Sequence, residues 1–184
     1  MLYTRKGDNG TTKTFGCDQR ISKSSNIAEA LGTLDEINSF LGVCKVKSAD
    51  AGFKVPTGEN FEKVVHVVQQ NLFIVQAELA GSDMTIGEDK VKEIENYVDT
   101  IEKELPPITS FFISGGSELA VFFDVARTIS RRAERRVIGV ADEGQVKVGD
   151  YTKAYLNRLS SLLYALARLS NHFSGIKEEP PTYK

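Results

Sequence analysis

Apolar residues recur every three or four positions through most of this chain, and this spacing constrains the fold more than any other feature of the sequence. One segment alternates steps of four and three throughout, at Phe61, Val65, Val68, Leu72, Val75 and Leu79. Residues at that spacing lie on one face of a helix. Four further segments have the same rhythm, at about 24–46 and in the runs that end at Leu105, Val140 and Phe173. We therefore predict an all-α fold, a bundle of five helices in a ferritin-like up-and-down arrangement.

Glycine and proline separate these segments and predict the connections between the helices. The breaks fall near residues 47–59, 81–88, 106–116 and 141–151. The best strand candidate is the short run FFIS at 111–114. Without an internal repeat or a linker, we expect a single domain over residues 1–184. Within it, residues 1–23 form a glycine-containing loop, and the polar, proline-containing residues 175–184 form a flexible tail that frays.

The overall charge argues against a general nucleic-acid binder. The chain has a formal net charge of −2 and a pI near 5.8, whereas such binders carry a basic surface over much of their length. Its first residues, MLYTRKGDNG, lack the apolar region of a signal peptide, and no apolar run approaches the roughly 18 residues that span a bilayer. We expect a cytoplasmic protein that binds neither nucleic acid nor membrane.

The cysteines and histidines give no pattern of a metal site. Cys17 and Cys44 lie far apart and outside any C-x-x-C motif, so we interpret them as reduced thiols. A di-iron centre in a helical bundle needs Glu-x-x-His pairs, and neither His66 nor His172 has a glutamate three positions before it. We expect no metal ligands among the protein side chains.

An unusual cluster of arginines lies in the fourth helical segment. Residues 126–136 contain Arg127, Arg131, Arg132, Arg135 and Arg136. The first, second and fourth of these share one helix face, with Glu134 beside them. A solvated basic face is the ordinary interpretation of such a cluster. Guanidinium, however, binds phosphate oxygens in pairs and never loses its charge, so the cluster also fits a polyphosphate site.

Two other segments fit the same kind of ligand. The fifth helical segment adds a polar face beside its leucines, with Asn157, Arg158, Ser161 and Arg168. The stretch TRKGDNGTTK at 4–13 combines glycines, threonine hydroxyls and basic side chains, which suits a phosphate cradle. It has no Walker A motif, and a flexible N-terminal arm is the alternative.

Taken together, these elements resemble the PduO-type ATP:cob(I)alamin adenosyltransferases. The resemblance rests on YTRKGDNGTT (3–12), ALGTLDEINSFLG (30–42), FFISGGSELAVFFDVARTISRRAERRV (111–137) and YLNRLSSLLYALAR (155–168). It implies transfer of the 5′-deoxyadenosyl group of ATP to cob(I)alamin, with release of inorganic triphosphate. It also implies a homotrimer in which ATP binds at each subunit junction, with Mg²⁺ held through the ATP phosphates and cobalamin as the second substrate.

The resemblance also assigns residues to the site. The N-terminal side of the ATP site would comprise Thr4, Arg5, Lys6, Gly7, Thr12, Lys13 and Lys23. The opposite side would comprise Arg131, Arg132, Glu134, Arg135 and Asn157. Asp35 would form an intersubunit ion pair with Arg127, and Phe111 would pack against the lower face of the corrin, with Phe112 as the alternative. The residues that carry the chemistry would be Arg131, Phe111, Asp35 and Arg127.

Three positions depart from the family pattern, namely Asn26, Ser114 and Ser161. Asn26 replaces a commonly basic residue, Ser114 a proline and Ser161 an aspartate. The resemblance further implies a reductase that supplies cob(I)alamin and a mutase that uses the product. Three alternatives stay open: another polyphosphate-using transferase or hydrolase, a corrinoid chaperone that delivers adenosylcobalamin, and a structural bundle.

Overall fold

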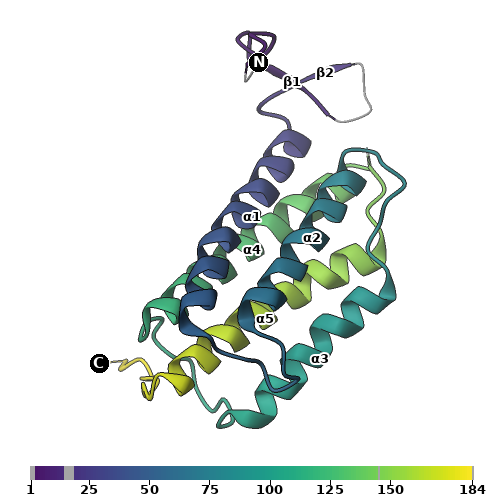
Figure 1. The fold of residues 1–184 in the computed structure, drawn as a ribbon. Coiled ribbons are helices and arrows are strands. Elements are labelled where there is room, and N and C mark those ends of the chain that lie inside the picture. Colours follow the sequence, from purple (N-terminus) through teal and green to yellow (C-terminus); the bar gives the residue numbers. More distant parts are fainter. Residues whose placement is uncertain (1–2, 15–18, 145, 184) are drawn as a thin grey trace.

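Five helices form one bundle, and a short hairpin precedes them. The computed structural model describes residues 3–14, 19–144 and 146–183. Its elements are β1 (Thr11–Lys13), β2 (Arg20–Ser22), α1 (Asn26–Ala51), α2 (Phe61–Leu79), α3 (Glu88–Glu104), α4 (Glu118–Asp142) and α5 (Asp150–Phe173). In Figure 1 the helices lie side by side and the hairpin projects beyond the first turn of α1. The five predicted helices are therefore confirmed, and a small two-stranded sheet that was not predicted accompanies them.

The ends of α1 follow from its capping residues. The Ser25 side chain accepts a hydrogen bond from the Ala28 amide and begins the helix. Gly52 ends it in the left-handed conformation with φ 65°, where its amide bonds the Ser48 carbonyl. The predicted end near residue 46 was five residues too early, because residues 47–51 contain no glycine or proline and the first residue suited to a left-handed cap is Gly52.

The β-structure lies in the N-terminal arm, which we define as residues 3–14 and 19–23. In the antiparallel pair, Thr11 faces Ser22, Thr12 faces Ile21 and Lys13 faces Arg20. The Arg20 guanidinium donates to the Thr11 hydroxyl at 2.6 Å and to the Thr11 carbonyl at 2.7 Å. The arm is thus more ordered than the predicted loop. Residues 111–114, the predicted strand candidate, have no strand structure.

The core consists of the predicted apolar faces. All six apolar residues of the α2 pattern are buried, as are Leu119, Phe123, Ala126, Ala133, Val137 and Val140 of α4. In α5 the buried run ends at Leu169, and Phe173 is 47% exposed where the helix ends. The Phe173 ring still packs on Phe53, with ring centroids 5.1 Å apart. Local periodicity therefore identified most of the core positions it named, although Ile27, Leu31 and Val98 are only partly buried and core residues such as Ile37 and Leu156 lay outside the predicted pattern.

No helix in the described residues is long and apolar enough to cross a membrane.

A buried carboxylate that the periodicity did not predict joins α2 to the start of α5. Glu78, only 7% exposed, accepts hydrogen bonds from the Thr85 hydroxyl at 2.9 Å and the Gly149 amide at 2.6 Å, and from the Thr152 hydroxyl. These bonds satisfy a charge that would otherwise be costly to bury, and they fix the loop between α2 and α3.

Replacing Glu78 with alanine is expected to lower the free energy of unfolding by about 2 kcal/mol, because three donors lose their acceptor and one of them, the Thr152 hydroxyl, is buried. Urea unfolding followed by circular dichroism measures this change. Glu102→Ala, at an exposed position of α3, is the control and should change the stability by less than about 0.5 kcal/mol. Equal stabilities for the two variants would contradict a structural role for Glu78.

The thiol of Cys44 lies in the core. Cys44 is fully buried on α1, and burial raises its pKa to about 12. At pH 8 only about 10⁻⁴ of this thiol is ionised, and the thiolate is the reactive form. Cys17 lies outside the described residues.

In a Cys17→Ser variant we therefore expect no measurable reaction of the native protein with a thiol reagent at pH 8, and stoichiometric labelling after denaturation. Mass spectrometry of the labelled chain gives both values. Rapid labelling of the folded variant would show that Cys44 is accessible.

Candidate active site

Polar contacts join α1 to α4 along their length and determine which way two of the arginines face. Arg132 pairs with Glu36, and the Arg136 guanidinium lies 3.7 Å from Glu29. At one end of the helix pair Asn26 donates to Glu143, and at the other Lys47 lies 3.1 Å from Glu118. Arg132, which the resemblance assigned to ATP, and Arg136, which had no assignment, are thus both compensated by acids of α1.

Two other arginines of α4 have no such compensation. Within residues 3–14, 19–144 and 146–183, neither Arg131 nor Arg135 makes a side-chain hydrogen bond or ion pair, and both are exposed. They lie one helical turn apart, so their positive charges reinforce one another on the same face. This face can bind an anion without first breaking an internal contact.

Arg131 also lines a pocket of about 350 Å³ between α4, α5 and the aromatic loop, which we define as residues 106–116. Among the residues that the sequence had singled out, the pocket gathers Phe111, Phe112, Arg127 and Arg131. Tyr164 and Ser161 of α5 line it too. Apolar rings and guanidinium groups thus share one cavity, which suits a ligand with both an apolar face and anionic groups.

Arg127 is held in place by two neighbours. Its Nε donates to an Asp124 carboxylate oxygen at 3.2 Å, and its guanidinium lies over the Tyr164 ring, 5.6 Å from the centroid. Burial raises the pKa of Tyr164, so its phenol stays neutral at physiological pH. Asp35, the assigned partner of Arg127, is exposed on α1. Within one chain the carboxylate beside Arg127 is that of Asp124.

The two phenylalanines of the aromatic loop differ in their surroundings. Phe111 lines the pocket with 81% of its surface exposed. Phe112 is half-buried, and the Arg168 guanidinium lies over its ring at 5.4 Å from the centroid. Phe111 is thus the ring with free surface for a ligand, whereas Phe112 is already packed. Ser114, one of the departures from the family pattern, also lines the pocket.

Glu134 and Asn157, assigned together to the ATP site, do lie together in the structure. The Asn157 amide donates to a Glu134 carboxylate oxygen at 3.0 Å. Arg158 donates to the Asn157 amide oxygen at 2.8 Å and to Glu95 at 3.0 Å. This chain of contacts fixes the polar surface between α4 and α5 next to Arg131 and Arg135.

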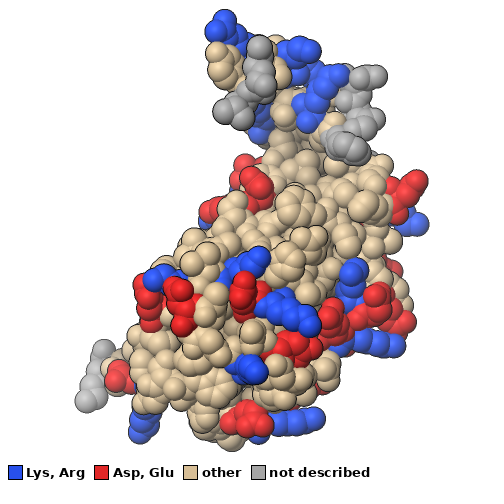
Figure 2. Space-filling model, in the orientation of Figure 1, with Lys and Arg blue, Asp and Glu red and all other residues tan. Residues whose placement is uncertain are grey.

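The N-terminal arm gathers its assigned residues around one turn. A side chain at Gly7 would lie 3.2 Å from both the Lys23 ammonium and the Thr11 carbonyl, so these groups close over the turn. The Lys6 amide donates to the Thr4 hydroxyl at 3.4 Å. Arg5 adopts a left-handed φ of 60°. Thr12 and Lys13 follow on β1, and Figure 2 shows Lys and Arg side chains concentrated on the arm.

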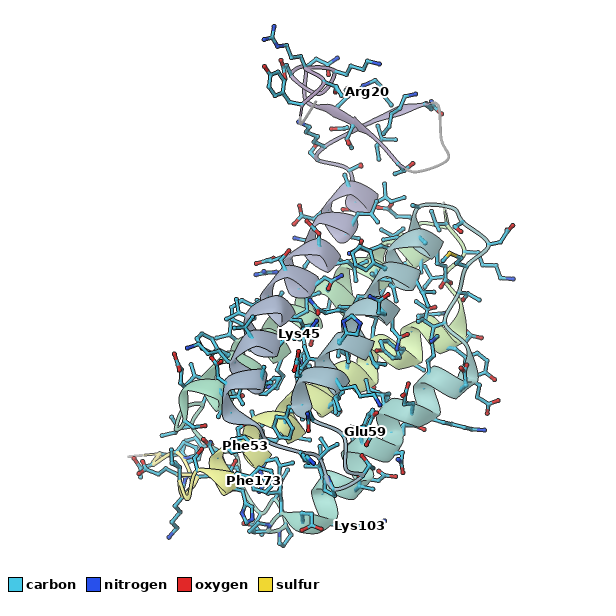
Figure 3. All side chains as sticks on the ribbon, viewed as in Figure 1. Arg20, Lys45, Phe53, Glu59, Lys103 and Phe173 are labelled. Atoms are coloured by element: carbon cyan, nitrogen blue, oxygen red, sulfur yellow. The ribbon has the colours of Figure 1, made fainter. Side chains whose placement is uncertain are left out.

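One chain does not bring the arm and the pocket together. Figure 3 shows Arg20 on the hairpin at one end of the molecule and Phe173, at the end of α5, near the other. The pocket lies toward that second end, because Asn171 and the aromatic loop line it. The pocket and the arm are thus separated within a single chain, and Arg131 is the member of the second group of predicted ATP-binding residues that lines the pocket.

The donor set of the site suits phosphate more than metal. Among the described residues there is no group of three or more His, Cys, Asp or Glu side chains that could hold a metal ion. The side chains assigned to the nucleotide are chiefly guanidinium, ammonium and hydroxyl groups, which bind phosphate oxygens.

Asp124 and Tyr164 of this region carried no assignment from the sequence, and Arg168 was named only as part of a polar helix face. Asp124 could have been found from its position one helical turn before Arg127, the spacing of a helical ion pair. Pro106 and Glu178, which Arg168 contacts, lie in segments without periodicity, so no sequence signal indicates them.

Comparisons with known proteins give the family to which the chain is similar. The family model described as cobalamin adenosyltransferase matches residues 2–170. The corrinoid adenosyltransferase PduO of Salmonella typhimurium is 39% identical over 174 residues, which cover 91% of this chain and 48% of that protein. The corrinoid adenosyltransferase of Bacillus subtilis is 37% identical over 180 residues, covering 95% of this chain and 89% of the relative. The chain therefore spans about half the length of the Salmonella relative and most of the Bacillus one.

A solved structure has the same fold over the full chain. It is a variant of a PduO-type ATP:corrinoid adenosyltransferase from Lactobacillus reuteri, complexed with cobalamin and ATP. It superposes with a TM-score of 0.87 at 26% identity and covers 100% of this chain and 97% of that one. The chain belongs to the cobalamin adenosyltransferase family.

Proposed function

We propose that this protein transfers the 5′-deoxyadenosyl group of ATP to cob(I)alamin, giving adenosylcobalamin and inorganic triphosphate. The observation that carries the proposal is the pocket in which Phe111 and Phe112 meet Arg127 and Arg131. Its apolar rings suit a corrin, and its cations suit a polyphosphate. The family match over residues 2–170 supports the same activity.

ATP binds between two subunits of a homotrimer, with the N-terminal arm of one chain facing α4 of the next. Two features support this arrangement: the arm and the pocket are separated within one chain, and Arg131 and Arg135 lack partners among the described residues. In the same assembly Asp35, exposed beside Gly32 on α1, pairs with Arg127 of a neighbour. Each subunit is a ferritin-like up-and-down bundle.

The reaction is a nucleophilic displacement. Cobalt(I) attacks C5′ of ATP, a Co–C bond forms, and the C5′–O bond breaks with its electron pair going to triphosphate. Arg131 and Arg135 stabilise the negative charge that develops on the leaving group. No group has to lose a proton, so a general base is unnecessary. The contribution of the protein is position and charge.

Mg²⁺ would be held through the ATP phosphates, and the cationic side chains described above would hold the remaining phosphate oxygens. When bound, the ion neutralises part of the triphosphate charge.

Phe111 covers the lower face of the corrin and keeps an axial base away from cobalt. Because its ring cannot ligate, it favours a four-coordinate cob(II)alamin that is reduced more easily. A reductase then supplies the electron, and a mutase takes the product; the cytoplasm is the compartment we propose for both steps.

An anaerobic assay with ATP and chemically reduced cobalamin tests the proposed function. We expect the absorption spectrum of adenosylcobalamin to appear together with one equivalent of triphosphate. Release of orthophosphate or pyrophosphate, or the absence of the adenosylated spectrum, would overturn the proposal.

A further inference from the structure

A buried arginine at the end of the pocket contacts two separate segments, the aromatic loop and the residues that follow α5. Arg168 of α5 is only 5% exposed. Its Nε donates to both carboxylate oxygens of Glu178, at 3.1 and 2.9 Å, and its Nη2 donates to the Pro106 carbonyl at 3.0 Å. The same guanidinium covers the ring of Phe112. We name these four residues the Arg168 clamp.

Asn171, one helical turn later, holds the other end of the aromatic loop. Its amide nitrogen donates to the Gly115 carbonyl at 2.9 Å, and its amide oxygen accepts from the Ser117 amide at 2.9 Å. Gly116 lies between these two contacts with φ 107°, and a Cβ there would collide with the Asn171 side chain. The loop is thus fixed at both ends by α5.

The C-terminal tail, which we define as residues 175–183, lies along this loop. The Ile113 amide donates to the Glu179 carbonyl at 2.9 Å, and the Ile176 amide donates to the Asn171 carbonyl at 2.9 Å. The tail that the sequence predicted to fray therefore contacts both the loop and α5. Through Glu178, it also supplies the carboxylate of the Arg168 clamp.

Because Arg168 is buried, the Arg168 clamp is stable only when all of its contacts are present. A buried guanidinium is stable only while its charge is paired and its donors are satisfied. The guanidinium group is planar and rigid. Its hydrogen bonds to Glu178 and Pro106 together therefore fix the plane that covers the Phe112 ring. Phe111 precedes Phe112 on the same stretch of backbone and both rings line the pocket, so fixing Phe112 also fixes the backbone that carries Phe111.

We propose that Arg168 and Glu178 are positioning residues for the corrin side of the site. They act through Phe112 and the aromatic loop to hold Phe111 where it meets the corrin, and the C-terminal tail is a working part of the active site. This inference rests on the proposed function. It adds a role for residues 175–183, which lie beyond the matched range of the family.

Glu178→Gln tests the proposal, and Glu179→Gln is its matched control. Both variants remove one negative charge from adjacent positions, but only Glu178 uses its carboxylate in the clamp, whereas Glu179 uses its backbone carbonyl. We expect Glu178→Gln to raise the KM for cob(I)alamin roughly tenfold, as expected for weakening a charge-assisted hydrogen bond, and to leave the KM for ATP unchanged. Glu179→Gln should change neither value.

Hydrogen exchange supplies a readout that is independent of catalysis. In Glu178→Gln, peptides covering residues 106–117 should exchange faster than in the wild type, and in Glu179→Gln they should not. Arg168→Lys keeps the positive charge but loses the planar guanidinium group, so its KM for cob(I)alamin and its exchange rates should resemble those of Glu178→Gln. Deletion of residues 175–184 should reproduce both effects if the folded bundle remains intact by circular dichroism.

The outcomes separate the clamp from the proposed function. Equal KM values and equal exchange in the two glutamine variants would overturn the positioning role. Faster exchange of residues 106–117 with an unchanged KM for cob(I)alamin would also overturn it, since the position of the aromatic loop would then have no effect on corrin binding. If the wild type fails to adenosylate cobalamin, the proposed function fails, and so does the corrin role that rests on it.

Discussion

Replacing Arg131 with alanine is expected to lower turnover by roughly 10²–10³-fold, the usual effect of deleting one preorganised donor to a developing charge. Arg131 lines the pocket and has no ion-pair partner in the part of the chain that the structure describes. Its charge is therefore available to the triphosphate leaving group. Anaerobic single-turnover measurements at saturating ATP and cob(I)alamin give the rate of the chemical step.

Arg136→Ala is the matched control for this prediction. Arg136 lies on the same helix but faces Glu29 of α1, at 3.7 Å, and both side chains are about half exposed. Such a surface pair contributes little, so turnover should change by less than about twofold. Near-normal turnover in Arg131→Ala, or equal losses in both variants, would contradict the role of Arg131 in binding phosphate.

Replacing Phe111 with alanine should impair the cobalt chemistry and spare ATP binding. We expect the rate of adenosylation to fall by roughly 10²-fold, because the ring that closes the lower face of the corrin is lost, a contact comparable to a buried phenylalanine worth about 3 kcal/mol. The Kd for ATP, measured by calorimetry, should stay within about twofold of the wild type. The spectrum of bound cob(II)alamin should lose its four-coordinate signature.

Two further variants sharpen the test of Phe111. Phe73→Ala removes an exposed ring from α2, outside the pocket, and should leave both measurements unchanged. Phe112→Ala removes the ring beneath Arg168, so it should also disturb the aromatic loop in hydrogen exchange. If only Phe112→Ala loses the four-coordinate signature, the capping residue is Phe112 and the assignment to Phe111 is wrong. A collapse of ATP affinity in Phe111→Ala would instead show that the ring is structural.

The helices were predictable because their signal is local. An apolar residue at every third or fourth position marks a buried face whatever the rest of the chain does, and the faces of α2 and α4 were found in this way. The hairpin was missed because its strands have only three residues each and so show no alternation. The end of α1 was misplaced because helix caps depend on single residues such as Gly52.

The candidate site was predictable only where a motif was available. The sequence singled out Phe111, Arg127 and Arg131, and the pocket gathers all three. Asp124 was missed although its spacing from Arg127 is that of a helical ion pair. Pro106 and Glu178, which Arg168 contacts, were missed because nothing in their own segments distinguishes them from surface residues. Glu178 in particular belongs to a polar tail, whose composition predicts fraying.

By itself, the sequence determined that this chain forms five helices, which faces of them are buried, and which family it resembles. Only the tertiary structure decided the roles of the individual arginines. Arg132 faces Glu36, which is 96 positions away, Arg131 faces the pocket, and Arg168 is buried against the tail. The reason is physical: helix periodicity fixes the face on which a side chain lies, but packing of distant segments fixes what that face meets. A guanidinium paired with a carboxylate is compensated, and one without a partner is free to bind an anion.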